Sequence, residues 1–297
     1  MSGGRISINK QNGAGFGYYR MGSVETGLLE ALDEEFSKGH INTYITGMAP
    51  GYFQDTVAVL QKIRKRGGRV WVGIAETVFV FTRPVQIVEG WKDHLKTMMD
   101  TLASEGLLDT MLGFYFDEPM LCGIRKEDFR DVTRHLRETW PGLRVFAIFA
   151  TNAISPDVWS SGDDHPLDPE TTRYLTDAGY DMYWDVRDGG IEPYKKVNAD
   201  LKKRLGREDV HIWYVPCIMS YHGASDEAYA LAHLEAMYQF LREESHPGGL
   251  MCYAYDIADH DGEVENIGYR ELRDRKEDAW TTLEERLLQI GREIVNG

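Results

Sequence analysis

Two patterns of hydrophobic and polar residues alternate along the whole chain. Short apolar runs, in which every second residue shares a face, are followed by longer stretches with apolar residues at helical spacing. The short runs predict eight strands, at residues 16–20, 41–46, 70–75, 112–117, 145–150, 181–185, 212–217 and 250–255. The longer stretches predict eight helices, at residues 25–37, 52–66, 91–105, 126–139, 169–177, 193–205, 226–244 and 271–295.

Strict alternation of strand and helix is typical of a parallel sheet built from βα units. Eight such units predict an α/β fold, a (β/α)8 TIM barrel that forms a single domain over residues 1–297. The main competitor is an open doubly wound sheet, but no phosphate-binding glycine motif follows any predicted strand. The longest loops after strands cover residues 76–90 and 152–168. In a barrel, these loops form the walls of the active site.

Bulk properties narrow the classes of function. A hydrophobic content of 42% is enough for a core, and no apolar run approaches the roughly 20 residues that cross a bilayer. The N-terminal residues lack the apolar segment of a secretory signal, so we expect a cytoplasmic protein. A formal net charge of −15 argues against nucleic acid or an anionic membrane as a partner, because both attract basic surfaces.

The sequence indicates no cofactor and no metal. Its three cysteines, Cys122, Cys217 and Cys252, are too few and too scattered for a disulfide framework or a zinc site with paired spacing. We expect them to be free thiols with structural roles. The sequence does not indicate the oligomeric state.

The most informative segment spans residues 113–119, where an apolar strand runs into Asp117 and Glu118 and is stopped by Pro119. Carboxylates at the C-terminal end of a barrel strand lie at the mouth of the barrel. The simpler interpretation is that Asp117 caps the next helix while Glu118 is solvated beside it. The other strand ends favour a functional site over this interpretation.

Polar and aromatic residues gather at several other predicted strand ends. Taken at period two, the inward-facing set includes Tyr44, Tyr115, Asp181, Tyr183 and Asp185. Strand three ends at Glu76, and later strands and loops add Trp159, Trp184, Tyr221, His222, Tyr253, Tyr255 and Asp256. Carboxylates that bind hydroxyl groups and rings that stack on sugar faces suit a carbohydrate ligand.

The strand-four residues resemble those of glycoside hydrolases of the (β/α)8 class, many of which carry the catalytic acid in a Glu-Pro step at that position. The adjacent pair Asp117 and Glu118 is more particularly similar to that of the β-N-acetylhexosaminidases. This resemblance implies that Glu118 protonates the leaving oxygen, while Asp117 orients the substrate's own acetamido group as the nucleophile.

Two further segments are similar to chitinase-like barrels. Residues 182–185 read Met-Tyr-Trp-Asp, which is similar to the Met-x-Tyr-Asp step of those proteins. Residues 248–256 are similar to their last strand, with Tyr253 in the place that usually holds tryptophan. The chitinase pattern Asp-x-Asp-x-Glu is not kept, because its places hold Tyr115, Asp117 and Pro119. The strand-seven glutamate of ordinary retaining enzymes is also missing, since residues 215–219 read Val-Pro-Cys-Ile-Met, and this disfavours the two-glutamate mechanism.

Together these features predict a glycosidase that acts on a carbohydrate substrate, with Glu118 as general acid/base and Asp117 assisting. Asp185 is the third predicted catalytic residue, and a second version of the mechanism uses Asp185 or Asp256 as nucleophile or base. The predicted substrate-binding residues are Tyr44, Glu76, Tyr115, Trp159, Tyr183, Trp184, Tyr221, His222, Tyr253, Tyr255 and Asp256.

Two other functions remain open at this point. One is a metal-dependent lyase or isomerase, with Glu76, Asp117, Asp185 and His222 around a divalent ion. The other is a barrel that binds glycans without cleaving them, which the missing strand-seven glutamate would explain.

Overall fold

The computed structural model describes residues 14–19, 29–162, 165–187, 189–220, 226–256 and 266–297. Its strands are β1 (Gly15–Tyr18), β2 (Thr43–Gly47), β3 (Arg69–Gly73), β4 (Phe79–Val80), β5 (Gln86–Ile87), β6 (Met111–Asp117), β7 (Arg144–Ala150), β8 (Asp177–Asp181), β9 (His211–Val215) and β10 (Pro247–Cys252). Its α-helices are α1 (Leu29–Ser37), α2 (Phe53–Lys65), α3 (Ala75–Val78), α4 (Trp91–Ser104), α5 (Lys126–Thr139), α6 (Thr151–Ile154), α7 (Glu192–Leu205), α8 (Glu227–Glu243), α9 (Tyr269–Arg273) and α10 (Thr281–Asn296). Two 3-10 turns, Pro50–Tyr52 and Leu108–Thr110, precede α2 and β6.

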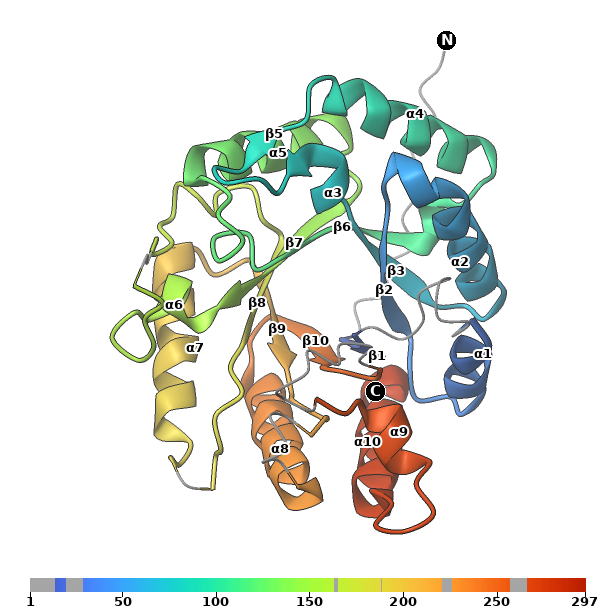
Figure 1. The fold of residues 1–297 in the computed structure, drawn as a ribbon, viewed down its shortest axis with the longest axis vertical. Coiled ribbons are helices and arrows are strands. Elements are labelled where there is room, and N and C mark those ends of the chain that lie inside the picture. The colour runs from blue at the N-terminus through green and yellow to red at the C-terminus, as the bar shows by residue number, and fades with distance from the viewer. Residues whose placement is uncertain (1–13, 20–28, 163–164, 188, 221–225, 257–265) are drawn as a thin grey trace.

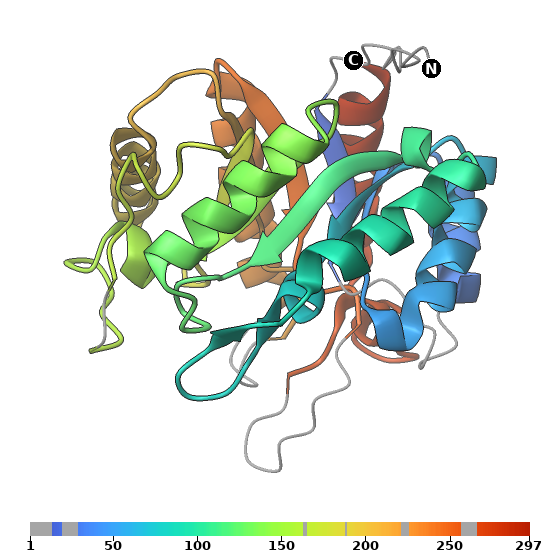
Figure 2. The ribbon, with the colours of Figure 1, turned by 90° about the horizontal axis from the view of Figure 1, so that it is seen from above.

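Eight parallel strands form a nearly closed barrel surrounded by helices, as the sequence predicts (Figure 1). The strand order is β1-β10-β9-β8-β7-β6-β3-β2, and β4 and β5 form a separate antiparallel hairpin. The first and last strands of this order, β1 and β2, approach each other at Asn42, which directly precedes β2. The Asn42 backbone N–H donates to the carbonyl of Phe16 on β1 at 3.0 Å. The Asn42 side chain accepts from the Phe16 N–H at 2.9 Å. Figure 2 shows α4 and α5, in shades of green, outside β6.

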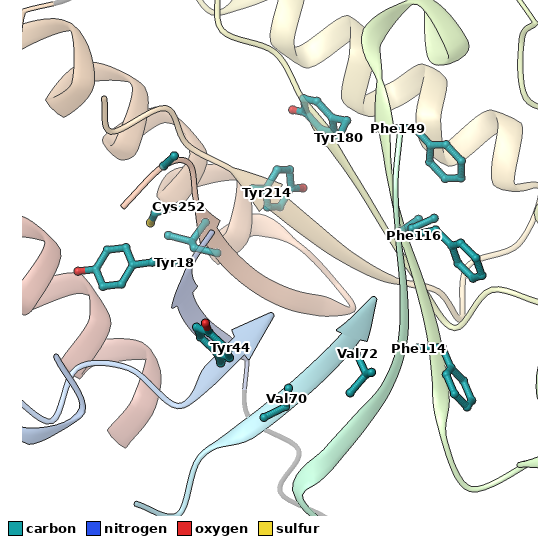
Figure 3. Close-up of a cluster of buried hydrophobic side chains, with 14 of the residues drawn as sticks. Tyr18, Tyr44, Val70, Val72, Phe114, Phe116, Phe149, Tyr180, Tyr214 and Cys252 are labelled. Carbon is teal, nitrogen blue, oxygen red and sulfur yellow. The ribbon is translucent and has the colours of Figure 1, made fainter. Parts of the chain in front are cut away.

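The hydrophobic core has two layers, one inside the barrel and one between the barrel and its helices. Trp71, Phe146 and Trp213 fill the inside, with ring centroids 5.0 to 5.9 Å apart. The outer layer contains Val70 and Val72 of β3 and also Tyr44 of β2 (Figure 3). The expectation that Tyr44 faces inward is therefore wrong, because the alternation on β2 is offset by one and Ile45 is the residue that packs on the inner layer.

The sixth barrel strand is the largest departure from the sequence prediction. β8 runs from Asp177 to Asp181, which is four residues earlier than the predicted span 181–185, and turns replace most of the predicted helix 169–177. Asp168 accepts hydrogen bonds from the Thr171 N–H at 2.8 Å and hydroxyl at 2.9 Å, which competes with helical hydrogen bonding. Asp177 enters the buried strand because the Arg144 guanidinium pairs with it through two nitrogens and the Trp213 indole N–H donates to it at 2.8 Å.

Two other predicted spans are subdivided in the structure. The predicted loop 76–90 contains most of α3 and the β4–β5 hairpin, and the predicted helix 271–295 forms as α9 and α10. Among the described helices, none combines the length and the apolar character that spanning a membrane requires.

Candidate active site

The end of β6 places two carboxyl groups at the mouth of the barrel. Asp117 is the last residue of the strand, and Glu118 follows in a left-handed backbone conformation with φ of +38°. A residue with a β-carbon rarely adopts this conformation, because its side chain approaches the neighbouring carbonyl oxygen. The turn is held by a hydrogen bond from the Glu118 N–H to the Ile148 carbonyl at 2.9 Å. Strain kept at one residue of a cavity is typical of a functional position.

Two tyrosine hydroxyls hold the Asp117 carboxylate. Tyr115 donates to its Oδ1 at 2.7 Å and Tyr19 donates to the same atom at 2.9 Å. Burial raises the pKa of Tyr19 well above its ordinary value, and the negative charge of Asp117 raises it further. Tyr19 therefore stays a hydroxyl donor at neutral pH, and Asp117 is the acceptor. Hydrogen bonds of this kind favour the ionised form of a carboxyl group.

A third carboxyl group, that of Asp181 at the end of β8, hydrogen-bonds to Glu118. Burial raises the pKa of Glu118 to about 7, and the charge of Asp117 adds to the effect, while the hydrogen bond with Asp181 opposes it. Burial also raises the pKa of Asp181 well above its usual range, and the charges of Glu118 and Asp117 act in the same direction. Glu118 and Asp181 therefore titrate as a pair that keeps a proton near neutral pH.

A cavity of about 470 Å³ opens above these carboxyl groups. Its wall contains the stacked rings of Tyr183 and Tyr253, whose centroids lie 5.4 Å apart at an angle of 11°. Trp159 and Trp184 also line it and remain 38% and 42% exposed, so their indole rings are open to a ligand. The remaining lining residues are Tyr19, Asp117, Glu118, Leu121, Ile148, Ala150, Thr151, Asp181, Met182 and Val215. Carboxyl groups beside flat aromatic surfaces suit a polyhydroxylated ligand.

Several predicted site residues lie away from this cavity. Asp185 is four residues beyond the end of β8 and is ion-paired with Arg187 at 2.6 Å. Glu76 lies on α3, exposed, and accepts from the Tyr52 hydroxyl at 2.9 Å. Tyr255 is fully buried and donates to Glu35 at 3.0 Å. Asp256 faces Arg270 at 3.9 Å and is not among the lining residues.

Tyr115 lies below the cavity, where its hydroxyl reaches Asp117 as described above. Tyr221 and His222 lie outside the described residues. Two ionisable residues of the cavity lining, Asp181 and Tyr19, were not predicted as site residues. Asp181 was expected at the start of a strand rather than at its end, because the span of β8 was misplaced. Tyr19 follows β1, and nothing in its local sequence distinguishes it from the neighbouring Tyr18, which is buried in the outer core.

The described residues contain no group of three histidine, cysteine, aspartate or glutamate side chains arranged to hold a metal ion. Of the residues in the metal-dependent alternative, Glu76 and Asp185 lie outside the cavity that Asp117 lines, and His222 lies outside the described residues. Cys217 and Cys252 are buried free thiols, and Cys122 is an exposed one.

Comparison with solved structures finds the same barrel in several glycoside hydrolases. A GH113 β-1,4-mannanase superposes with a TM-score of 0.56 at 13% identity, over 93% of this chain and 98% of the mannanase chain. An α-amylase from Lactobacillus plantarum gives 0.50 at 11% identity, over 95% of this chain and 80% of the amylase chain. Bacteroides uniformis β-glucuronidase gives 0.55 at 13% identity, over 88% of this chain and 33% of the longer enzyme.

At these identities the similarity establishes the fold, which is a TIM barrel shared with glycoside hydrolases. No protein-family model matches the sequence, and no curated protein matches it. Any activity of this chain is therefore inferred from the geometry of the site.

Proposed function

We propose that the protein is a glycosidase in which Glu118 protonates the leaving oxygen of a glycoside. The observation that carries this proposal is the pair of hydrogen-bonded carboxyl groups, Glu118 and Asp181, in the lining of the cavity. Glu118 has its pKa raised to about 7, so it holds a proton at the pH where an acid catalyst must deliver one. It also lies beside Asp117, an acceptor held by two tyrosine hydroxyls.

The hydrogen bond between Glu118 and Asp181 bears on the role of Asp181. An acid and a nucleophile on the protein stand about 5–5.5 Å apart in retaining enzymes, and about 6.5–9.5 Å separate the acid and base of inverting enzymes. Carboxyl groups in direct hydrogen bond are closer than either arrangement. We therefore assign Asp181 to proton sharing with Glu118 rather than to nucleophilic attack, and Asp181 replaces Asp185 as the third proposed catalytic residue.

This arrangement favours the version in which the substrate supplies its own nucleophile. In that version the acetamido oxygen attacks the anomeric carbon, the glycosidic bond breaks, and the Glu118 proton goes to the departing oxygen. Asp117 accepts the acetamido N–H and stabilises the positive charge that develops on the cyclic intermediate. Water then opens the intermediate, and its proton returns to Glu118. The net reaction consumes one water and releases an N-acetylhexosamine and an alcohol.

Trp159 and Trp184 are the proposed sugar platforms. Their exposed rings flank the carboxyl groups within the same cavity, so a sugar that reaches Glu118 can place an apolar face on one of them.

The test is turnover of nitrophenyl glycosides and natural glycans, including N-acetylhexosaminides, with and without a chelator. We expect chelator-resistant release that falls about a hundredfold to ten-thousandfold in Glu118→Gln. The loss should be smaller for a dinitrophenyl leaving group, which needs little protonation, than for an alkyl leaving group. A merely structural role for Glu118 would lower both rates equally.

Asp181→Asn tests the role of the carboxyl group that hydrogen-bonds to Glu118, and Asp185→Asn is its matched control. We expect Asp181→Asn to lose most of the activity and Asp185→Asn to keep it within about threefold, because only Asp181 contacts the acid. Near-normal rates in Glu118→Gln, or activity that a chelator removes, would overturn the proposal. Tight glycan binding without any product would instead support a binding protein.

A further inference from the structure

The cavity wall after β8 is held by side chains from the outer helices. β8 ends at Asp181, and the next three residues, Met182, Tyr183 and Trp184, all line the cavity. Each of their backbone carbonyls accepts a hydrogen bond from a side chain. Tyr229 of α8 donates to the Tyr183 carbonyl at 2.6 Å. Polar backbone that leaves a sheet needs such partners when it is buried.

The other two carbonyls are bound by Tyr194 of α7 and His233 of α8. The Tyr194 hydroxyl lies 3.2 Å from the Met182 carbonyl and also contacts the carbonyl of Trp184. Nε2 of His233 lies 2.8 Å from the Met182 carbonyl oxygen. Two packed helices thus fix three consecutive peptide units of the wall.

The hydrogen bonds of His233 determine its tautomer. Nδ1 accepts from the Cys217 N–H at 2.9 Å, so the proton of the neutral ring must be on Nε2, which faces the Met182 carbonyl at 2.8 Å and the Tyr194 hydroxyl at 2.9 Å. Burial lowers the pKa of His233 to about 4, and the ring therefore remains neutral. His233 joins the segment after β9 to the segment after β8 and gives the wall a fixed distance from the barrel.

Tyr183 connects this wall to the carboxyl groups. Its hydroxyl donates to Oδ2 of Asp181 at 3.4 Å, and its ring stacks on Tyr253. A displacement of the Tyr183 backbone would lengthen a hydrogen bond that is already long. Asp181 in turn hydrogen-bonds to Glu118.

We propose that Tyr229 and His233 are positioning residues, which hold Tyr183 against Asp181 and thereby help to set the pH at which the Glu118–Asp181 pair loses its proton. This inference rests on the proposed function for its catalytic meaning, since neither residue lines the cavity. Their substitution acts on the reaction only through the wall.

The experiment compares Tyr229→Phe, Tyr183→Phe and the double variant, with Tyr180→Phe as the control. Tyr180 lies one residue before Asp181, and its buried hydroxyl has no hydrogen-bond partner among the described residues. Each single variant removes one hydroxyl oxygen and keeps the ring. The carboxyl carbons of aspartate and glutamate are labelled with ¹³C, and Glu118→Gln and Asp181→Asn assign the two signals for a pH titration.

Loss of the Tyr183 donor removes a bond that favours ionised Asp181, so the upper pKa of the pair should rise. We expect a rise of about half a unit in Tyr229→Phe and in Tyr183→Phe, the size of one weak hydrogen bond. The double variant should show no further rise, because both changes act through Tyr183. The other groups that face Asp181, which are Asp117, Glu118 and Tyr19, are the same in the wild type and in all four variants.

His233→Gln and His233→Asn separate the role of the Nε2 donor from that of the Nδ1 acceptor. The glutamine amide reaches the Nε2 position and keeps a donor for Met182, whereas asparagine keeps only an acceptor for Cys217. We expect the titration of His233→Gln to lie closer to that of the wild type than the titration of His233→Asn does.

An unshifted titration in Tyr229→Phe, or additive shifts in the double variant, would overturn the positioning role. The ¹³C titration does not depend on turnover. If the protein cleaves no glycoside, only the proposed function is overturned, and the titration still tests the positioning role of Tyr229 and His233. Where turnover is found, the alkaline limb of kcat/KM should move with the titration, whereas general destabilisation would lower the rate without moving the limb.

Discussion

The clearest consequence of the half-buried carboxyl pair, Glu118 and Asp181, is that it makes the stability of the protein depend on pH. Glu118 has a pKa of about 7 in the folded state against an ordinary value of 4.5. The folded state therefore binds a proton that the unfolded state has already released between these two pH values. A raised pKa contributes stability below pH 4.5, and this stability is lost as the pH rises to 7.

The magnitude follows from the pKa difference at about 1.4 kcal/mol for each pH unit, which gives a loss of about 3 kcal/mol. Glu118→Gln removes the titration and keeps the shape of the side chain. It also relieves Asp181 of a neighbouring negative charge, which acts in the same direction. We therefore expect Glu118→Gln to gain about 3 kcal/mol relative to the wild type between pH 4.5 and pH 8, although it loses activity.

Urea unfolding at several pH values between 4.5 and 8.5 measures this difference. Glu208→Gln, at an exposed position after α7, is the control for the loss of one negative charge from an acidic protein. The gain of Glu118→Gln over this control should increase steadily with pH and level off above 7. A constant difference at all pH values would refute the raised pKa of Glu118 in the folded state.

Three other predictions follow from the same site. Because Glu118 must carry a proton to act as the acid, kcat/KM should fall tenfold per pH unit above about 7, as a pH-rate profile will show. Tyr19→Phe removes one of the two donors to Asp117 and should lower kcat about tenfold with little change in the urea midpoint, whereas unchanged kcat would remove Tyr19 from the site. Trp159→Ala or Trp184→Ala should raise KM about two- to tenfold and leave kcat within about twofold, and an effect on kcat alone would contradict a stacking role.

The sequence predicts the barrel because its evidence is local and repeated. Each apolar run and each amphipathic stretch independently indicates one element, so an error in one leaves the eightfold count intact. The Asp117–Glu118–Pro119 step is local in the same sense, since the end of an apolar strand is visible in the sequence. The period-two assignment on β2 fails because both faces of a parallel barrel strand are buried, and Tyr44 and Ile45 are then equally plausible as inward residues.

Asp181 depends on an interaction that no local pattern contains. Its position at the mouth is fixed by the register of β8, and that register is fixed at the opposite end, where Asp177 is fully buried. An aspartate costs too much to bury alone, so the sequence places Asp177 at the end of the predicted helix 169–177 rather than in a buried strand. Arg144 on β7 and the Trp213 indole on β9 change this balance, because they satisfy the carboxylate from both neighbouring strands. The position of the third carboxyl group of the site thus follows from an ion pair at the base of the barrel, and only the assembled sheet brings Arg144, Asp177 and Trp213 together.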